Sequence, residues 1–218
     1  SRGLGYVYKI QVYLWLKKKF DDALILSNKL LKTEKNVPFL FNLNGLINLS
    51  LENWENSVQV FQQAIDCDDK FVEAYNNLGI AYSHLGKEDK AIENYNKAIE
   101  INPNYLYGFY NRAFVKSSIK DFKGAISDYT KAIEINPNDE SAYINRGFAK
   151  RKLKDYYGAI SDYSKAIEIN PNDINYYFNR SVAKEKIGDI KGACVDAKKA
   201  VSLGDTASDN KSWIRDNC

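Results

Sequence analysis

AIEINPN occurs at residues 98–104, 132–138 and 166–172, so the same heptapeptide returns after 34 residues each time. A fixed period of this length is typical of repeat proteins, in which each period is one supersecondary unit that packs against the next. The sequence therefore predicts a stack of units rather than one globular core. Such a stack usually presents a surface that binds another molecule.

One period, residues 72–105, is predicted to form two helices joined by a turn. Apolar and small residues with the helical spacing i, i+3, i+4, i+7 mark the first helix: Tyr75, Leu78, Gly79 and Tyr82. Gly86 suits the left-handed conformation that ends a helix, and Pro103 ends the second helix because it has no N–H to donate. The apolar stripe of the second helix consists of Ala91, Tyr95 and Ala98.

The same arrangement extends without gaps in both directions and divides the chain into six repeats. Their ranges are 4–37, 38–71, 72–105, 106–139, 140–173 and 174–207. Repeat 4–37 is the weakest, with Gln11 in the place that Gly79 has in its own repeat. Aspartates stand where helices should begin and are predicted to cap them: Asp121, Asp139, Asp155, Asp173 and Asp189.

This order of an aromatic residue, Leu-Gly, Tyr, Ala, aromatic, Ala and Pro resembles the tetratricopeptide repeat (TPR) family. The resemblance implies an all-α fold, a right-handed superhelical solenoid of helix-turn-helix repeats that forms a single domain over residues 1–218. First helices would line a concave wall and second helices a convex one, and a capping helix is expected at about 208–217. Repeats four to six resemble those common in bacterial, especially cyanobacterial, TPR proteins.

An asparagine recurs every 34 residues on the predicted first helices: Asn77, Asn111, Asn145 and Asn179. In the TPR family this place lines the concave groove. An amide offers both a donor and an acceptor, which suits the backbone of an extended peptide. Four aromatic residues accompany the asparagines and would supply apolar pockets: Tyr110, Phe114, Phe148 and Phe178.

Two other interpretations of these residues remain open. The asparagines could bond water or neighbouring helices instead of a ligand, whereas a peptide site requires that their amides face an open groove. For Phe114 and Phe148, packing between successive hairpins is the favoured interpretation.

Three repeats carry Arg where the TPR pattern has Leu, and the same repeats carry Asp sixteen residues later. These pairs are Arg112 with Asp128, Arg146 with Asp162, and Arg180 with Asp196. A lysine four residues after the Arg is also confined to these repeats: Lys116, Lys150 and Lys184. Because the Asp accompanies the Arg, we expect a structural ion pair between two helices, rather than a basic stripe for anionic ligands.

Catalysis, cofactors and metals find little support in the sequence. The chain has one histidine, His84, and it has no glycine-rich phosphate loop. Its cysteines, Cys67, Cys194 and Cys218, lack the spacing of metal ligands. The sequence therefore predicts a protein that is not an enzyme and has neither cofactor nor metal.

The cysteines also bear on the compartment. Cys67 and Cys194 fall on helical stripes and are predicted to be small core residues, whereas Cys218 is expected to be free in an exposed tail. An odd number of cysteines favours a reducing compartment, and no apolar run is long enough for a membrane span. These features favour the cytoplasm. The sequence starts at Ser1 without Met, which predicts that residues preceded it.

The charge distribution limits the partners. The net charge is +3, and residues 38–105 hold four Lys and Arg against ten Asp and Glu, which argues against nucleic acid. Chaperone tails are also disfavoured, because the carboxylate clamp of TPR co-chaperones needs basic residues. In this chain those places hold Ser141, Asn145, Asn175 and Asn179.

The leading hypothesis is a non-catalytic scaffold that binds a peptide or protein segment in the concave groove. The second is an accessory targeting or assembly module of a larger enzyme or complex, and a nucleic-acid binder is a distant third. Head-to-tail association of copies through the uneven charges is a further alternative.

Overall fold

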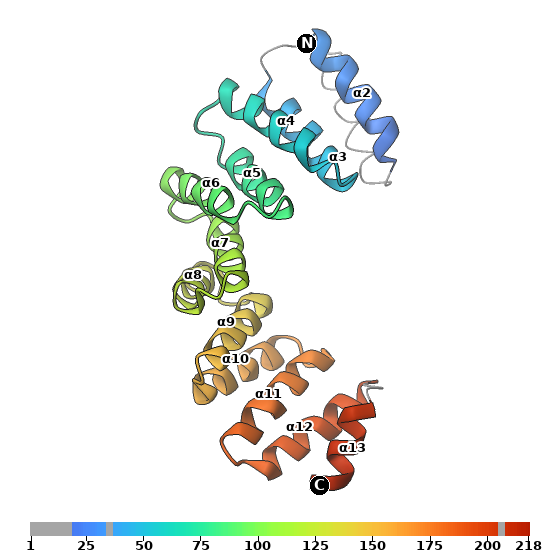
Figure 1. The fold of residues 1–218 in the computed structure, drawn as a ribbon, viewed down its shortest axis with the longest axis vertical. Coiled ribbons are helices and arrows are strands. Elements are labelled where there is room, and N and C mark those ends of the chain that lie inside the picture. Colours follow the sequence, from blue (N-terminus) through green and yellow to red (C-terminus); the bar gives the residue numbers. More distant parts are fainter. Residues whose placement is uncertain (1–18, 34–36, 205–207) are drawn as a thin grey trace. The chain divides into compact units, whose positions relative to one another are not determined.

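The computed structural model describes residues 19–33, 37–204 and 208–218, and within these ranges the chain is helical apart from turns (Figure 1). No strand occurs in this described portion, so the predicted all-α fold is confirmed. Most of the first helix predicted for repeat 4–37 falls in residues 1–18 and lies outside the described residues.

The helices divide between two compact parts, Ser1–Asn111 and Arg112–Cys218, and the boundary falls inside helix α7 (Leu106–Ser118). The described helices of the first part are α2 (Phe20–Thr33), α3 (Pro38–Ser50), α4 (Trp54–Cys67), α5 (Val72–His84) and α6 (Glu88–Ile101). Those of the second part are α8 (Phe122–Ile135), α9 (Glu140–Lys152), α10 (Tyr156–Ile169), α11 (Ile174–Lys186), α12 (Ile190–Ser202) and α13 (Ser208–Asn217).

Within each part, consecutive helices pack as hairpins, and each hairpin packs against the next. In the first part α3 pairs with α4 and α5 with α6, while α4 contacts α5. In the second part α9 pairs with α10 and α11 with α12, while α8 contacts α9 and α10 contacts α11. This nearest-neighbour packing is that of a repeat protein, in which each unit buries its apolar face against the adjoining one.

Close approach of the two helices of a hairpin depends on a glycine opposite an aromatic ring. A Cβ added to Gly79 would lie 2.5 Å from the ring of Tyr95, and one added to Gly147 would lie 2.7 Å from the ring of Tyr163. Both rings are buried, and burial raises the pKa of the Tyr95 and Tyr163 hydroxyls, because the charged form would lose its hydration. The Gly–aromatic contact therefore sets the hairpin spacing.

The predicted aspartate caps are present at five helix starts. The side chain of Asp155 accepts a hydrogen bond from the backbone N–H of Gly158 at 2.9 Å, at the start of α10. The other four caps are Asp121, Asp139, Asp173 and Asp189. In the first part, α4 and α6 begin after Asn53 and Lys87, which make no side-chain cap bond. The first backbone N–H groups of α8 to α12 are thus better satisfied than those of α4 and α6.

Candidate interaction surface

The asparagine ladder of the first part forms a continuous relay of amide hydrogen bonds. Asn111 on α7 donates to Oδ1 of Asn76 on α5 at 2.9 Å. Asn76 donates to Oδ1 of Asn77 at 3.3 Å, and Asn77 donates to Oδ1 of Asn42 on α3 at 2.9 Å. Asn42 and Asn76 are buried, while Asn77 and Asn111 are half-buried.

This relay bears on the two interpretations of these rungs. Asn77 and Asn111 each donate one amide hydrogen bond to a neighbouring helix, which is the alternative to a bond with a ligand, and both side chains stay partly exposed. These bonds form because another asparagine stands one residue before the rung position, at Asn42 and Asn76. Its side-chain oxygen reaches the rung of the next hairpin. Such a relay ties three first helices together.

In the second part, Asn179 donates to the backbone oxygen of Asn175 one turn earlier in α11, at 2.9 Å. This bond stays within one helix, unlike those of Asn77 and Asn111. Asn145 is half-buried on α9.

The aromatic residues predicted to line the groove lie on first helices and are partly open to solvent. Phe114 on α7 is 57% exposed and Phe178 on α11 is 39% exposed. The exposed ring of Phe114 overturns the expectation that it packs between hairpins. Tyr110 and Phe148 are half-buried.

Basic side chains surround Phe148. The guanidinium carbon of Arg151 lies 5.4 Å from the centre of the Phe148 ring, and the ammonium of Lys152 lies 5.2 Å from it. Both distances are within the range of cation–π attraction. Arg151 and Lys152 stand in the last turn of α9, where the helix dipole favours positive charge. We name Phe114, Phe148, Arg151, Lys152 and Phe178 the aromatic–basic surface.

The three predicted Arg–Asp pairs are present, and each is bidentate within its own hairpin. Arg146 donates from Nε and Nη2 to the two oxygens of Asp162 at 3.0 and 2.7 Å. Lys150 adds a second cation, with Nζ 2.8 Å from Asp162 Oδ2. The same triad recurs in the neighbouring hairpins: Arg112, Lys116 and Asp128, and Arg180, Lys184 and Asp196.

Each of two arginines also reaches the preceding hairpin. Arg146 Nη1 donates to Thr130 Oγ1 on α8 at 3.0 Å, and Arg180 Nη1 donates to Ser164 Oγ on α10 at 3.0 Å. One guanidinium therefore joins three helices. Because the aspartates are buried and fully paired, these arginines are structural rather than available to an anionic ligand.

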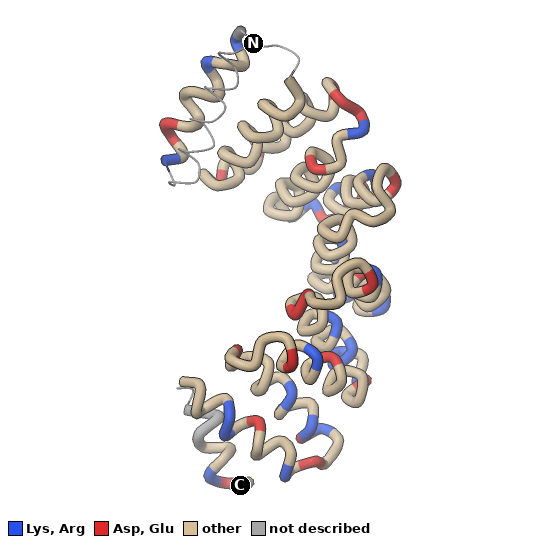
Figure 2. Tube along the Cα trace, turned by 180° about the vertical axis from the view of Figure 1, so that it is seen from behind, with Lys and Arg blue, Asp and Glu red and all other residues tan. Residues whose placement is uncertain are grey.

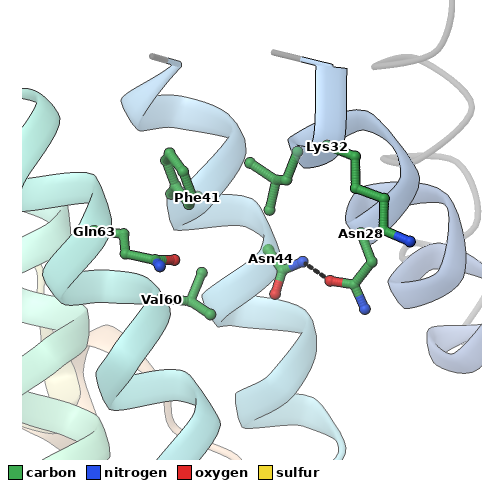
Figure 3. Close-up of a pocket in the computed structure, with 7 residues that line it drawn as sticks. Asn28, Lys32, Phe41, Asn44, Val60 and Gln63 are labelled. Carbon is green, nitrogen blue, oxygen red and sulfur yellow. Dashed lines mark hydrogen bonds between the residues drawn. The ribbon is translucent and has the colours of Figure 1, made fainter. Parts of the chain in front are cut away.

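The corresponding place in the first part holds a cavity instead of a triad. Asn44 and Val60 stand where Arg146 and Asp162 stand in the second part. Asn44 donates to Asn28 Oδ1 and to Ser27 Oγ, each at 2.9 Å. Figure 3 shows the Asn44–Asn28 bond at the wall of a cavity of about 450 Å³. Its lining residues are Asn28, Leu31, Lys32, Phe41, Asn44, Val60 and Gln63.

The metal-binding side chains and the single histidine were located in the part of the chain that the structure describes. No group of three or more His, Cys, Asp or Glu there could hold a metal ion. His84 stacks on Trp54, with ring centres 4.1 Å apart and planes 3° from parallel. Among the described residues, no helix is both long and apolar enough to span a membrane.

The cysteines differ from the sequence-based expectation. Cys194 on α12 and Cys218, directly after α13, form a disulfide, whereas Cys67 is free and half-buried. The predictions of Cys194 as a core residue and of Cys218 as a free thiol are therefore wrong. The two can pair because α13 returns onto α12 (Figure 1), and their Cα atoms lie 5.7 Å apart.

Comparison with known protein families identifies the repeat. The family pattern described as "Tetratricopeptide repeat" matches residues 72–105 and 141–173, and that described as "TPR repeat" matches residues 45–86 and 118–154. Together these matches cover more than half of the chain. No curated protein matches it.

Many solved structures share the fold at low sequence identity. Pseudomonas aeruginosa pilF is 13% identical, with a TM-score of 0.82 over 97% of this chain and 96% of its own. YrrB, described as a TPR protein with an unusual peptide-binding site, is 18% identical, with a TM-score of 0.73 over 87% of this chain and 97% of its own. MamA from Desulfovibrio magneticus RS-1 is 22% identical, with a TM-score of 0.71 over 76% and 94%.

Proposed function

The chain belongs to the tetratricopeptide repeat family, and from this premise we propose that it is a non-catalytic scaffold that binds a segment of another protein along its first helices. The observation that carries the proposal is the aromatic–basic surface on α7, α9 and α11. Exposed aromatic rings on a folded protein cost hydration free energy, and exposed apolar surface rimmed by polar groups commonly marks a binding site.

The composition of this surface indicates the chemistry of its partner. Phe114 and Phe178 offer apolar contact area, while the exposed Lys152 offers positive charge beside Phe148. A segment with an apolar or aromatic residue flanked by Asp or Glu would satisfy both. The triad arginines do not contribute, because their guanidinium groups are already bonded to buried aspartates.

A related structure supports a peptide as the partner. YrrB is described as having a peptide-binding site, and it shares this fold over most of both chains. Its 18% identity does not transfer individual residues, so the site in this chain is argued from the residues of this chain alone.

The test is a selection of random peptides displayed on phage against the immobilised chain, followed by binding titrations of the enriched peptides. We expect acidic peptides with an apolar anchor, whose affinity falls at least about tenfold in the Phe114→Ala/Phe148→Ala variant, since each buried aromatic contact contributes on the order of 1–2 kcal/mol. The matched control is Tyr157→Ala, which removes a 74% exposed aromatic residue from α10, a second helix.

The control separates a specific surface from general stickiness. Equal losses in both variants, or peptides that bind the double variant as well as the wild type, would contradict the proposed site.

A further inference from the structure

The position of Cys194 in the repeat differs from that of its equivalents. Ile92, Ile126 and Ile160 occupy this place on earlier second helices, each 34 residues before the next. All three are half-buried apolar side chains. In the last hairpin the place holds Cys194, and its sulfur is bonded to Cys218, 24 residues later, with the two Cα atoms 5.7 Å apart.

The helix that the disulfide holds has few other attachments among its described side chains. Helix α13 has ten residues and packs against α12 (Figure 1). Its described apolar residues are Trp213 and Ile214, both half-buried. Arg215 pairs with Asp216 at 3.2 Å, and Asn217 donates to the backbone oxygen of Trp213 at 2.9 Å, so these polar side chains bond within the helix.

A helix this short is marginal in water without tertiary contacts. Two half-buried apolar side chains are the apolar contact that its described residues supply, so the covalent bond to Cys194 adds a restraint on which the docking of α13 can depend. The helical hydrogen bond from the N–H of Cys218 to the oxygen of Ile214, at 2.9 Å, extends the restraint into the last turn.

We propose that Cys194 and Cys218 are a reversible dithiol–disulfide site that controls whether α13 is docked on the last hairpin. On oxidation the two thiols lose two protons and two electrons, and one S–S bond forms. The electron acceptor is another disulfide, such as oxidised glutathione, which becomes two thiols. On reduction, a dithiol reductant delivers the two electrons and two protons and is itself oxidised to a disulfide.

Exposure makes the two sulfur atoms accessible to both an oxidant and a reductant. Cys218 is exposed and Cys194 is half-buried. A reductant thiolate therefore attacks the Cys218 sulfur, forms a mixed disulfide there and releases the Cys194 thiolate; the second thiol of the reductant then frees Cys218. Cys67 on α4, in the other part of the chain, takes no part and serves as an internal control.

Hydrogen exchange with mass spectrometry tests the proposal on the full chain. The oxidised protein, prepared with oxidised glutathione, should yield a cross-linked Cys194–Cys218 peptide and slow exchange over residues 212–218. Reduction with dithiothreitol should accelerate exchange there several-fold and leave α9 and α10 unchanged. Cys218→Ser and Cys194→Ser should each match the reduced protein without reductant, and Cys67→Ser should behave as the wild type.

Two results would overturn the proposal. One is failure to recover the cross-linked peptide after oxidation. The other is equal exchange of α13 in the oxidised protein, the reduced protein and both serine variants, which would mean that packing alone holds the helix. Because each serine variant replaces a single sulfur atom near the surface, unchanged exchange in α9 and α10 verifies that the variants fold.

Discussion

At the scale of single residues, a buried carboxylate determines what its neighbours must be. The side chain of Asp162 is 4% exposed and accepts bonds from Arg146 and Lys150. Removing a carboxylate from water is costly unless it is paired and hydrogen-bonded, so the Asp requires both cations. The third repeat solves the same packing problem without charge, with Leu78, Tyr82 and Asn94 in the three places.

This comparison gives a prediction about the triads. Arg146→Leu alone should lower the free energy of unfolding by about 2–3 kcal/mol, because Asp162 loses two charge-assisted bonds. The triple variant Arg146→Leu/Lys150→Tyr/Asp162→Asn, which copies the third repeat, should stay within about 1 kcal/mol of the wild type, because no buried charge is left unpaired. Urea unfolding followed by circular dichroism measures both. Equal midpoints for the single and triple variants would refute the pairing argument.

The asparagine relay predicts an effect on stability that an open groove would not. Asn111→Ala leaves the buried Oδ1 of Asn76 without its donor, which should cost about 1–2 kcal/mol of unfolding free energy. Asn138→Ala, at an exposed turn, is the matched control and should cost less than about 0.5 kcal/mol. If both variants unfold at the wild-type urea concentration, the relay contributes nothing to stability.

At the scale of the helix, the hairpin spacing depends on small residues opposite rings. Ala normally stabilises a helix interior relative to Gly by about 1 kcal/mol. Gly79→Ala should nevertheless lower the stability by about 1 kcal/mol or more, because its Cβ would lie 2.5 Å from the Tyr95 ring. The fourth repeat has Ala113 in this place, so a hairpin can adjust to it, which limits the expected cost.

Thermal unfolding of Gly79→Ala measures the sign of this effect directly. A rise in the melting temperature would show that helix propensity outweighs the ring contact. It would also mean that the glycine does not set the spacing of α5 and α6.

The helices and their caps were predictable because their causes are local. Apolar spacing, the Asp that starts a helix and the Gly or Pro that ends it all lie within one repeat, and the 34-residue period showed how hairpins follow one another. The triads were also accessible, since Arg, Lys and Asp occur together in the same repeats.

The interaction surface was less predictable because it depends on relations between repeats. The relay needs an amide oxygen 35 residues away, and the exposure of Phe114 depends on neighbours that periodicity does not specify. The disulfide depends on where α13 lies, and Cys194 in an isoleucine place was the one available signal. An odd cysteine count concealed the pair, so it gives no support to a reducing compartment.

At the scale of the whole molecule, the two halves differ in charge and in the groups that join their hairpins. Residues 1–111 hold twelve basic and thirteen acidic residues, whereas residues 112–218 hold nineteen and fifteen. Figure 2 shows both signs of charge along the helices. Hydrogen bonds between asparagine side chains connect first helices in the first part. Arginine side chains connect hairpins in the second part.

A single solenoid over the whole chain stays a prediction, and its consequence is coupled unfolding. Trp54 lies in the first part and Trp213 in the second. In the single-tryptophan variants that keep one or the other, fluorescence should report the same urea midpoint, because neighbouring repeats unfold cooperatively. Two midpoints separated by more than about 1 M, a difference of roughly 1–3 kcal/mol at typical urea dependence, would indicate independent parts.

The most direct test of the central claim is to locate a bound peptide on the chain. A selected acidic peptide with a photoreactive group beside its apolar residue would be cross-linked to the protein, and the attachment sites read by mass spectrometry. The account predicts cross-links on the first helices α7, α9 and α11, concentrated near Phe148 and lost in the Phe114→Ala/Phe148→Ala variant. Cross-links confined to the second helices α8, α10 and α12 would contradict it.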